Sequence, residues 1–225
     1  MKHTFTFKNT KKLFALLGLL LFAATSCKKK DDTMPVRGTA YIEVVNASQT
    51  DAPIDFFIGS TKKNTQPTGY TQSISYFSID AGQTLPASIK VSSTGNTLVN
   101  MNLTPLPNVY YSIFYFGGLT TSYVDDLTTV ADKARVRFIN LNKGETGNLD
   151  YGIKNANVPL VTNLGPAFDS VYCTVTAGST FSVYATGTTN SILDIPTTIQ
   201  AGHVYTIFLS GETTSELQAT VLQQK

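Results

Sequence analysis

The sequence is poor in the side chains that most catalytic and metal sites use. Its 225 residues include two His, two Cys and no Trp, and charged residues make up 14% of the chain, against about 25% in an average globular protein. This scarcity leaves little material for a metal site or a His-based active site. It also excludes a coiled coil, a basic nucleic-acid binder and a charged disordered chain. We therefore expect no cofactor, no metal and no nucleic-acid partner.

Small hydroxylated residues take the place of the missing charges. The chain contains 33 Thr and 17 Ser, and 42% of its residues are hydrophobic. A composition rich in Thr favours strands over surface helices, and the hydrophobic fraction is large enough for a buried core. The composition therefore predicts an all-β protein.

Residues 1–26 have the organisation of a secretory signal peptide. Met1 to Lys12 carries four Lys and no acid, and Leu13 to Ala24 is an uncharged apolar run. This run is shorter than the roughly twenty residues that a membrane-spanning helix needs. We expect residues 1–26 to be removed during export, and no later segment to cross a membrane.

The end of this leader points to a lipid anchor. The segment Phe22-Ala23-Ala24-Thr25-Ser26-Cys27 resembles a bacterial lipobox, which implies that Cys27 becomes the lipidated N-terminus and that residues 27–36 form a tether. The alternative is an ordinary signal peptide cut near Ser26, which would leave a free Cys. Cleavage before Cys27 removes four Lys and no acid, so the formal net charge changes from +2 to −2.

The tether carries a second short signal. Lys30, Asp31 and Asp32 resemble the surface-export signal of Bacteroidota lipoproteins. The resemblance implies an outer-membrane lipoprotein on the extracellular face, with the periplasmic face as the alternative. Asp32-Thr33-Met34 and Asp169-Ser170-Val171 resemble the sites at which Bacteroidota O-glycosylate exported proteins, which makes Thr33 and Ser170 candidates for that modification.

The rest of the chain repeats one pattern of strand-like blocks. Four blocks recur in the same order at nearly constant offset, starting at Tyr41 and Arg135, Ile54 and Leu149, Phe77 and Cys173, and Tyr111 and Tyr205. The blocks alternate apolar and polar residues and are separated by turn signals, a pattern typical of antiparallel β-sandwiches with about seven short strands. We expect two tandem sandwiches of the Ig-like or Greek-key type, over residues 37–119 and 134–225, with a linker over residues 120–133.

The two copies resemble the domain of unknown function 4397. That family combines an alternating first strand ending in a small residue or Asn, an apolar-Asp-apolar second strand, an Ala-Gly turn and a Tyr-rich late strand, and the likeness extends from about Arg37 to Glu216. The resemblance implies a secreted or lipid-anchored bacterial β-sandwich and brings no catalytic or binding residue with it. Tyr151 and Gly152 depart from the first copy, which leaves roles specific to one copy open.

Four features of the two copies are candidate sites. His203 is the sole His after the leader, and Val109 takes its place in the first copy, so the repeat does not require it. Cys173 aligns with Phe77 on a core face and is expected to be a buried free thiol. Asp55 and Asp150 are equivalent and are interpreted as structural carboxylates. A Ca²⁺ site using Asp51, Asp55 or Asp125-Asp126 lacks the spacing of known loops.

The densest aromatic cluster covers residues 110–116, which read as a central strand of the sandwich. Exposed aromatic faces can form sugar-binding platforms, so Tyr110, Tyr115 and Tyr123 are the candidate ligand-binding residues if any of this region is exposed. The sequence favours a non-catalytic cell-envelope module that binds a glycan, a peptide or an envelope protein. A structural spacer without a ligand is the alternative, and a hydrolase is disfavoured because acid-base side chains are scarce.

Overall fold

The computed structural model describes residues 37–144, 147–156 and 158–225, all of which belong to one compact unit of the chain. These residues form strands, turns and one short 3-10 helix, η2 (Thr214–Glu216). The first half contains β1 (Gly38–Asn46), β2 (Ile54–Ile58), β3 (Thr61–Lys62), β4 (Ser73–Ala81), β5 (Leu85–Val91), β6 (Thr97–Leu103), β7 (Tyr110–Phe116) and β8 (Leu119–Asp125). The second half contains β9 (Ala134–Asn140), β10 (Leu149–Ile153), β11 (Pro159–Leu164), β12 (Cys173–Val175), β13 (Phe181–Ala185), β14 (Ser191–Ile195), β15 (Val204–Ser210) and β16 (Gln218–Gln223).

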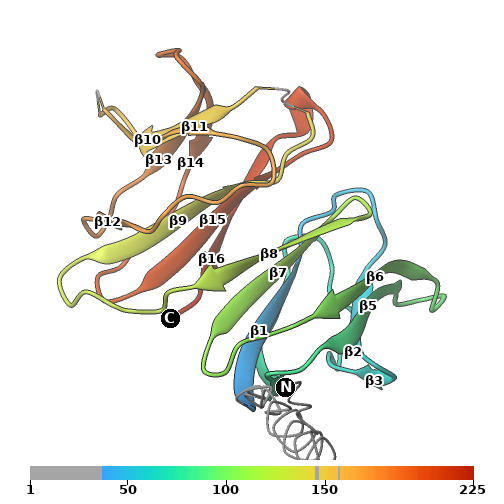
Figure 1. Ribbon diagram of the computed structural model, residues 1–225. Coiled ribbons are helices and arrows are strands. Elements are labelled where there is room, and N and C mark those ends of the chain that lie inside the picture. The colour runs from blue at the N-terminus through green and yellow to red at the C-terminus, as the bar shows by residue number, and fades with distance from the viewer. Residues whose placement is uncertain (1–36, 145–146, 157) are drawn as a thin grey trace, which may run out of the picture. The chain divides into compact units, whose positions relative to one another are not determined.

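Each half is a sandwich of two four-stranded sheets (Figure 1). In the first half, sheet A has the order β4-β1-β7-β8 and sheet B the order β3-β2-β5-β6. In the second half, sheet C has the order β12-β9-β15-β16 and sheet D the order β11-β10-β13-β14. The all-β sandwich architecture predicted from the sequence is confirmed. The sheets are antiparallel except for one parallel pair in each half, β1 with β7 and β9 with β15.

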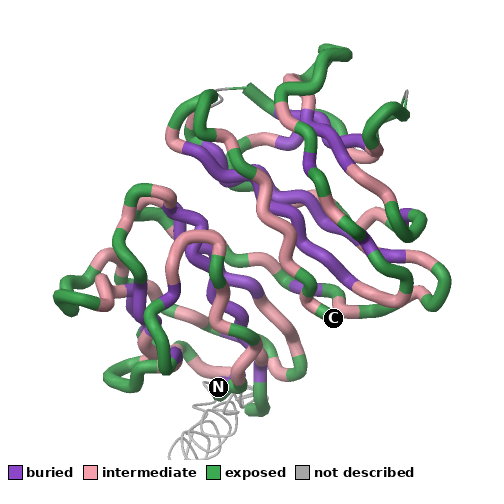
Figure 2. The backbone as a smooth tube through the Cα atoms, turned by 180° about the vertical axis from the view of Figure 1, so that it is seen from behind, coloured by how far each residue is buried: buried purple, intermediate pink, exposed green. Residues whose placement is uncertain are grey.

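Apolar and polar side chains alternate along the strands, and the apolar ones form a separate core between the two sheets of each half. Ile42 and Val44 of β1 point between sheets A and B, and Val136 and Phe138 of β9 point between sheets C and D. Figure 2 shows the buried residues concentrated along the strands, while the exposed residues lie mainly in the connections. The two cores explain why strands of two to nine residues with few charges are stable here.

The register of the strands makes the two halves repeat-like in detail. Ile42 pairs with Phe77 in sheet A, and Val136 pairs with Cys173 at the equivalent place in sheet C. The backbone N–H of Tyr41 donates to the carbonyl of Val109, as that of Arg135 donates to the carbonyl of His203. These pairs match the alignment predicted from the sequence.

The expected linker is partly wrong. Residues 120–125 belong to β8, which pairs with β7 along its whole length, so the connection between the halves is residues 126–133. The described part of each half has eight strands rather than about seven. The alternation along β8 is weak because two of its three positions on the side of sheet B, Thr120 and Ser122, are polar; the third is Val124.

The outer faces of sheets A and C contact each other. A third apolar cluster contains Val45 and Phe114 from sheet A with Ile139 and Phe208 from sheet C, and the rings of Phe114 and Phe208 meet edge to face at 5.4 Å. These equivalent positions of the two halves thus pack on one another, which buries the side of each sheet that faces away from its own core.

A polar cluster lies beside this apolar contact. The guanidinium of Arg137, which has no exposed surface, donates to the carboxylate of Asp125 and to the hydroxyl of Thr206. Nε2 of Gln224 donates to the hydroxyls of Ser112 and Tyr76 at 3.0 and 3.1 Å. Most of these polar atoms are satisfied, which is the condition under which such burial is tolerated.

Candidate functional site

The predicted anchor and export residues lie outside the described residues. This applies to Cys27, Lys30, Asp31, Asp32 and the candidate modification site Thr33. Ser170 is described and half-buried. Its hydroxyl accepts a hydrogen bond from the backbone N–H of Phe138 and donates one to the carbonyl of Val171.

The aromatic candidates do not form an exposed platform. β7 is an interior strand of sheet A, as the sequence predicts. Tyr115 has no exposed surface, and its hydroxyl donates to Asp51 at 2.6 Å, so the condition for its ligand-binding role is not met. Tyr110 is half-buried and stacks on Tyr41 at 4.5 Å. Tyr123 packs its ring on Phe114 and donates its hydroxyl to a backbone carbonyl.

The contacts of Cys173 and His203 do not indicate a chemical role for either residue. Cys173 is half-buried rather than fully buried, and it packs against the core between sheets C and D. Burial raises the pKa of its thiol. Nδ1 of His203 lies 3.1 Å from the carbonyl of Lys225 and 3.1 Å from Nε2 of Gln223. No group of three or more His, Cys, Asp or Glu that could hold a metal occurs in the described ranges.

A different surface, the outer face of sheet D, has the features of a binding site. Side chains alternate along β10 and β13, so Tyr151 points into the core while Asp150 and Gly152 face outward. The antiparallel register places Asp150 opposite Tyr184 and Gly152 opposite Ser182. These four outward positions therefore lie next to one another on the sheet. Tyr184 is half-buried, whereas Asp150, Gly152 and Ser182 are buried beneath neighbouring parts of the chain.

Two hollows adjoin the ring of Tyr184, and we call them together the Tyr184 site. The first hollow, of about 330 Å³, is bounded by Asp150, Gly152 and Pro159. The second, of about 290 Å³, is bounded by Lys154, Ser182 and Asp194. Both hollows also share Ala156, Tyr184 and Thr189.

The first hollow owes its depth to the absence of a side chain. A β-carbon built at Gly152 would lie 3.7 Å from Cε2 of Tyr184 and 3.4 Å from Cα of Pro159. Any larger residue would therefore occupy the space beside the Tyr184 ring.

Asp150 brings a fixed negative charge to the first hollow. Its carboxylate accepts hydrogen bonds from the backbone N–H of Asn163 at 2.7 Å, the hydroxyl of Thr186 at 2.9 Å and the backbone N–H of Gly187 at 3.3 Å. Burial raises the pKa of Asp150, but these three donors outweigh it, so the pKa lies below the ordinary value of a carboxyl. Asp150 is therefore ionised at neutral pH and held in one orientation, in keeping with the structural role predicted for it.

The second hollow is bordered by an ion pair whose two charges offset each other. Nζ of Lys154 lies 2.7 Å from Oδ2 of Asp194, and the hydroxyl of Ser182 donates to Oδ1 of the same carboxylate at 2.7 Å. These contacts lower the pKa of Asp194. The Tyr184 site thus combines one aromatic ring with carboxylates, hydroxyls and an ammonium group.

The equivalent surface of the first half carries different side chains. Lys90 and Phe57 occupy the positions of Tyr184 and Gly152, and Nζ of Lys90 lies 4.7 Å from the centre of the Phe57 ring. Asp55, the counterpart of Asp150, is paired with Nζ of Lys62 at 2.7 Å. The two halves share a backbone here but differ in the side chains that would meet a ligand.

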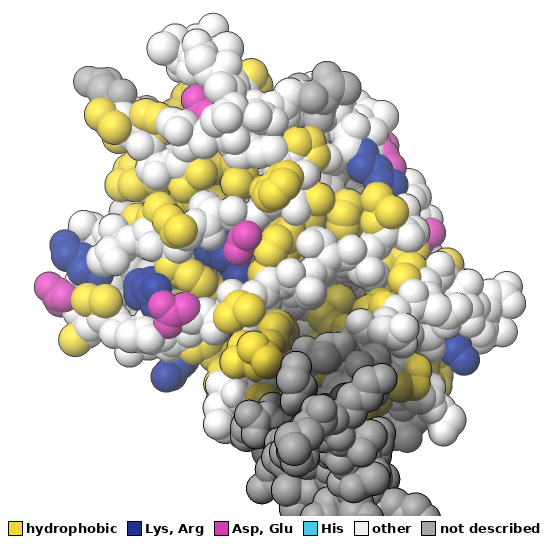
Figure 3. Space-filling view, in the orientation of Figure 1, with side chains coloured by type: hydrophobic (Ala, Val, Ile, Leu, Met, Phe, Trp, Pro, Cys, Tyr) yellow, Lys and Arg dark blue, Asp and Glu magenta, His cyan; other side chains and the backbone are white. Residues whose placement is uncertain are grey.

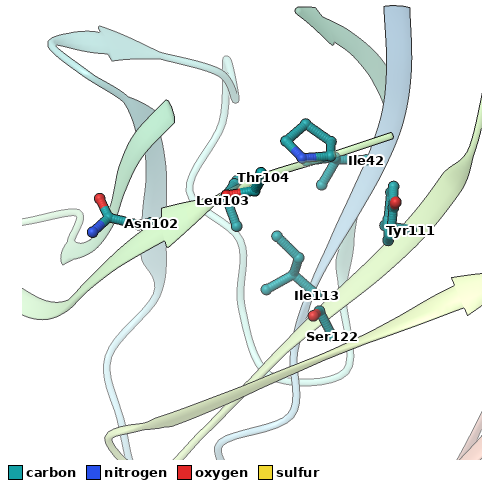
Figure 4. A pocket seen from close by; sticks show the side chains of 8 residues that line it. Ile42, Asn102, Leu103, Thr104, Tyr111, Ile113 and Ser122 are labelled. Carbon is teal, nitrogen blue, oxygen red and sulfur yellow. The ribbon is translucent and has the colours of Figure 1, made fainter. Parts of the chain in front are cut away.

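A smaller apolar cavity of about 140 Å³ lies at the edge of the first sandwich. Figure 4 shows Ile42, Leu103 and Ile113 around it, with Ser122 of β8 on one side. At the position equivalent to Ser122, the second half has Val221, which packs against the core. This cavity is therefore a place where one half is less completely packed than the other.

The sequence reasoning missed Tyr184 as a site residue. The sequence predicts a strand at this residue and shows that Tyr151 and Gly152 depart from the first copy, but the densest aromatic segment, residues 110–116, suggests the ligand contacts. The signal was available in the repeat itself, because aligning the copies sets Tyr184 against Lys90 and Gly152 against Phe57 on outward positions. Figure 3 shows how few charged side chains share the viewed surface with hydrophobic and neutral polar ones.

No helix long and apolar enough to span a membrane occurs within the described ranges. The model of one family, a domain of unknown function (DUF4397), matches residues 40–152, which span the first half and continue to β10. Comparison with curated proteins gives no match.

Several solved structures show a distant likeness. The C-terminal domain of AlgF from P. aeruginosa is 19% identical, with 41% of this chain and 98% of that domain covered and a TM-score of 0.32. A family CBM26 module from Eubacterium rectale Amy13K, solved with maltoheptaose, is 13% identical, with coverages of 83% and 97% and a TM-score of 0.28. Family 41 carbohydrate-binding modules from streptococcal virulence factors are 10% identical, with coverages of 80% and 97% and a TM-score of 0.26. These scores are too low to establish a shared fold or function.

Proposed function

The chain belongs to the family of the domain of unknown function DUF4397, and from that premise we propose that it is a non-catalytic module that binds a glycan at the Tyr184 site. The observation that carries the proposal is the outer face of sheet D, where the half-buried Tyr184 ring borders two hollows lined by polar groups. A sugar has an apolar ring face and a rim of hydroxyls. The Tyr184 ring can stack on the apolar face of the sugar, and the hydroxyls and carboxylates around Tyr184 can form hydrogen bonds with the sugar hydroxyls.

The carboxylates of the site suit binding better than hydrolysis. A glycosidase needs one carboxyl that keeps its proton near neutral pH, whereas the pKa values of Asp150 and Asp194 are both lowered. Asp150 accepts three hydrogen bonds from the protein, and Asp194 accepts one from Ser182 and pairs with Lys154, so the positions of both carboxylates are fixed. A fixed acceptor orients a bound hydroxyl and contributes to specificity.

The envelope location forms part of the same proposal. Lipidation of Cys27 would anchor the mature chain in the outer membrane, and Lys30, Asp31 and Asp32 would direct it to the extracellular face, with the periplasmic face as the alternative. Thr33 and Ser170 are proposed as O-glycosylation sites. The second half, which shares the strand order of the first, is proposed as a second copy of the family domain.

A glycan array tests the binding function. The mature chain with Cys27→Ser, which stays soluble, is applied to an array of plant, microbial and mucin-type oligosaccharides. Binding to at least one structural class is expected. Absence of binding to every glycan, by a protein whose fold is confirmed by circular dichroism, would contradict the proposal.

A structural spacer is the second candidate function. The contact between sheets A and C favours it, because the buried Phe114–Phe208 and Arg137–Asp125 pairs would resist bending between the two halves. A spacer needs no ligand, so binding that depends on Tyr184 would decide in favour of the first candidate.

A further inference from the structure

We infer that the Tyr184 site takes an uncharged glycan of at least two sugar units, and that each chain carries one such site. This inference rests on the proposed function and names the class of ligand. It follows from the shape of the site, from its charges and from the difference between the two halves.

The shape of the site points to more than one sugar unit. The two hollows adjoin the same ring, since Tyr184, Ala156 and Thr189 border both. Each has a volume, about 330 and about 290 Å³, that has room for a sugar unit. A glycan lying across Tyr184 would place consecutive units in the two hollows, and a single sugar would leave one of them empty.

The charges of the site point to an uncharged ligand. Asp150 is the one ionisable carboxylate or cation that borders the first hollow among the described residues, and the hydrogen bonds from Asn163, Thr186 and Gly187 keep it ionised. In the second hollow the charges of Lys154 and Asp194 offset each other. The site as a whole is therefore negative, and like-charge contacts disfavour uronates, sialic acids and sulfated sugars.

The first half explains why one site is expected per chain. Its equivalent surface carries Phe57 where the second half has Gly152, and Lys90 lies over that ring at 4.7 Å. Its carboxylate, Asp55, is neutralised by Lys62 at 2.7 Å. The first half therefore has a lysine over its aromatic ring and a paired carboxylate where the second half has Tyr184 and the unpaired carboxylate of Asp150.

Isothermal titration calorimetry of the mature chain with Cys27→Ser tests this inference. The uncharged probes are hexasaccharides of the malto, cello, xylo and manno series with their monosaccharides, and the acidic probes are hexagalacturonate and sialyllactose. We expect at least one uncharged hexasaccharide to bind with one ligand per chain and at least about tenfold more tightly than its monosaccharide and every acidic probe.

The outcomes separate the two proposals. Equal or tighter binding of an acidic probe, equal binding of a monosaccharide, or two ligands per chain would overturn the inference and leave the glycan-binding function standing. Failure of every probe here, together with an array that shows no binding, would overturn the function itself.

Asp150→Asn supplies a second test, with circular dichroism to confirm that the variant folds. The variant is expected to bind hexagalacturonate more tightly than the parent chain does. If it does not fold, the parent chain in low and high NaCl replaces it, because screening weakens the repulsion of acidic probes and leaves uncharged probes unaffected. If the ratio of affinities for uncharged and acidic probes does not change in the test that is used, the role of Asp150 in excluding acidic glycans is contradicted.

Discussion

Gly152 lies so close to the ring of Tyr184 that a β-carbon at residue 152 would stand 3.7 Å from Cε2 of the tyrosine. The hollow beside the ring therefore depends on the absence of a side chain at one position. The first half has Phe57 at the same place, with Lys90 over its ring in the position of Tyr184. Two differences between otherwise repeat-like halves, Gly152 for Phe57 and Tyr184 for Lys90, thus create the hollow beside a tyrosine ring.

Filling the hollow should remove binding without harming the fold. Gly152→Val places a branched side chain against Tyr184, and we expect glycan affinity to fall by at least about tenfold. The melting temperature should stay the same or rise, because Val has a higher strand propensity than Gly. Calorimetric titration and thermal unfolding measure the two effects. Unchanged affinity would show that the ligand does not enter this hollow; Phe57→Gly in the first half is the matched control and should leave affinity unchanged.

The buried ion pair between the halves should matter for stability. Arg137→Ala leaves the carboxylate of Asp125 buried without its cation, and we expect a loss of about 3 kcal/mol or more in the free energy of unfolding. Arg135→Ala is the comparison variant, because Arg135 pairs with Asp126, whose side chain is 54% exposed; its removal leaves no buried charge without a partner, and a smaller loss is expected. Urea denaturation measures both. Equal losses for the two variants would contradict the buried contact between sheets A and C.

Glu43 should make the protein less stable as the pH rises. Burial raises the pKa of Glu43, and the nearby charge of Asp125 adds to the effect, although hydrogen bonds from Ser73 and Gln224 partly offset it. The folded state therefore binds the proton more tightly than the unfolded chain, and this contribution to stability is complete below the ordinary pKa of 4.5 and is lost as the pH rises through the raised value.

Glu43→Gln tests the sign of that effect. The neutral amide needs no proton, so the variant should melt at a higher temperature than the parent chain at pH 7, with the difference shrinking towards pH 4.5. Thermal unfolding across this range checks it. A parent chain that is more stable than the variant at pH 7 would mean that the Glu43 carboxylate is stabilising when charged.

The cavity in the first sandwich should accept an extra side chain. Ser122→Val restores the residue type that the second half has at Val221, and it places apolar atoms beside Ile42 and Ile113. We expect a gain of about 1 kcal/mol in the free energy of unfolding. Val221→Ser in the second half should have the opposite sign. A loss of stability in Ser122→Val would indicate that the cavity cannot accommodate the added groups.

The sequence predicts the strands in which apolar and polar residues alternate and the apolar residues are the buried ones. The predicted blocks starting at Tyr41 and Arg135 are strands β1 and β9 in the structure, and the predicted central strand over residues 110–116 is the interior strand β7. The sequence predicts a linker where β8 lies, because polar residues such as Ser122, which lines a cavity, interrupt the apolar alternation of this strand. Its outward Asp125 is buried by the other half, a contact that local sequence does not reveal.

The site was harder to predict for a related reason. Composition pointed to the aromatic cluster around Tyr115, but density of aromatic residues does not say which face of a sheet is covered. Tyr115 points between two sheets and is buried, whereas Tyr184 points away from its core. Whether a tyrosine is buried between two sheets or lies on an outer face depends on the strand register and on whether another sheet covers that face. Both are properties of the tertiary structure.

The glycan-binding role of Tyr184 can be tested by one comparison of two equivalent positions. Affinity for the best-bound glycan of the array is measured for the mature Cys27→Ser chain, for its Tyr184→Ala variant and for its Lys90→Ala variant, with circular dichroism as the check on folding. We predict that Tyr184→Ala lowers affinity by at least about tenfold, through loss of the stacking surface, while Lys90→Ala leaves it unchanged. Equal affinities for all three proteins, or a greater loss in Lys90→Ala, would contradict the assignment of the binding site to the outer face of sheet D.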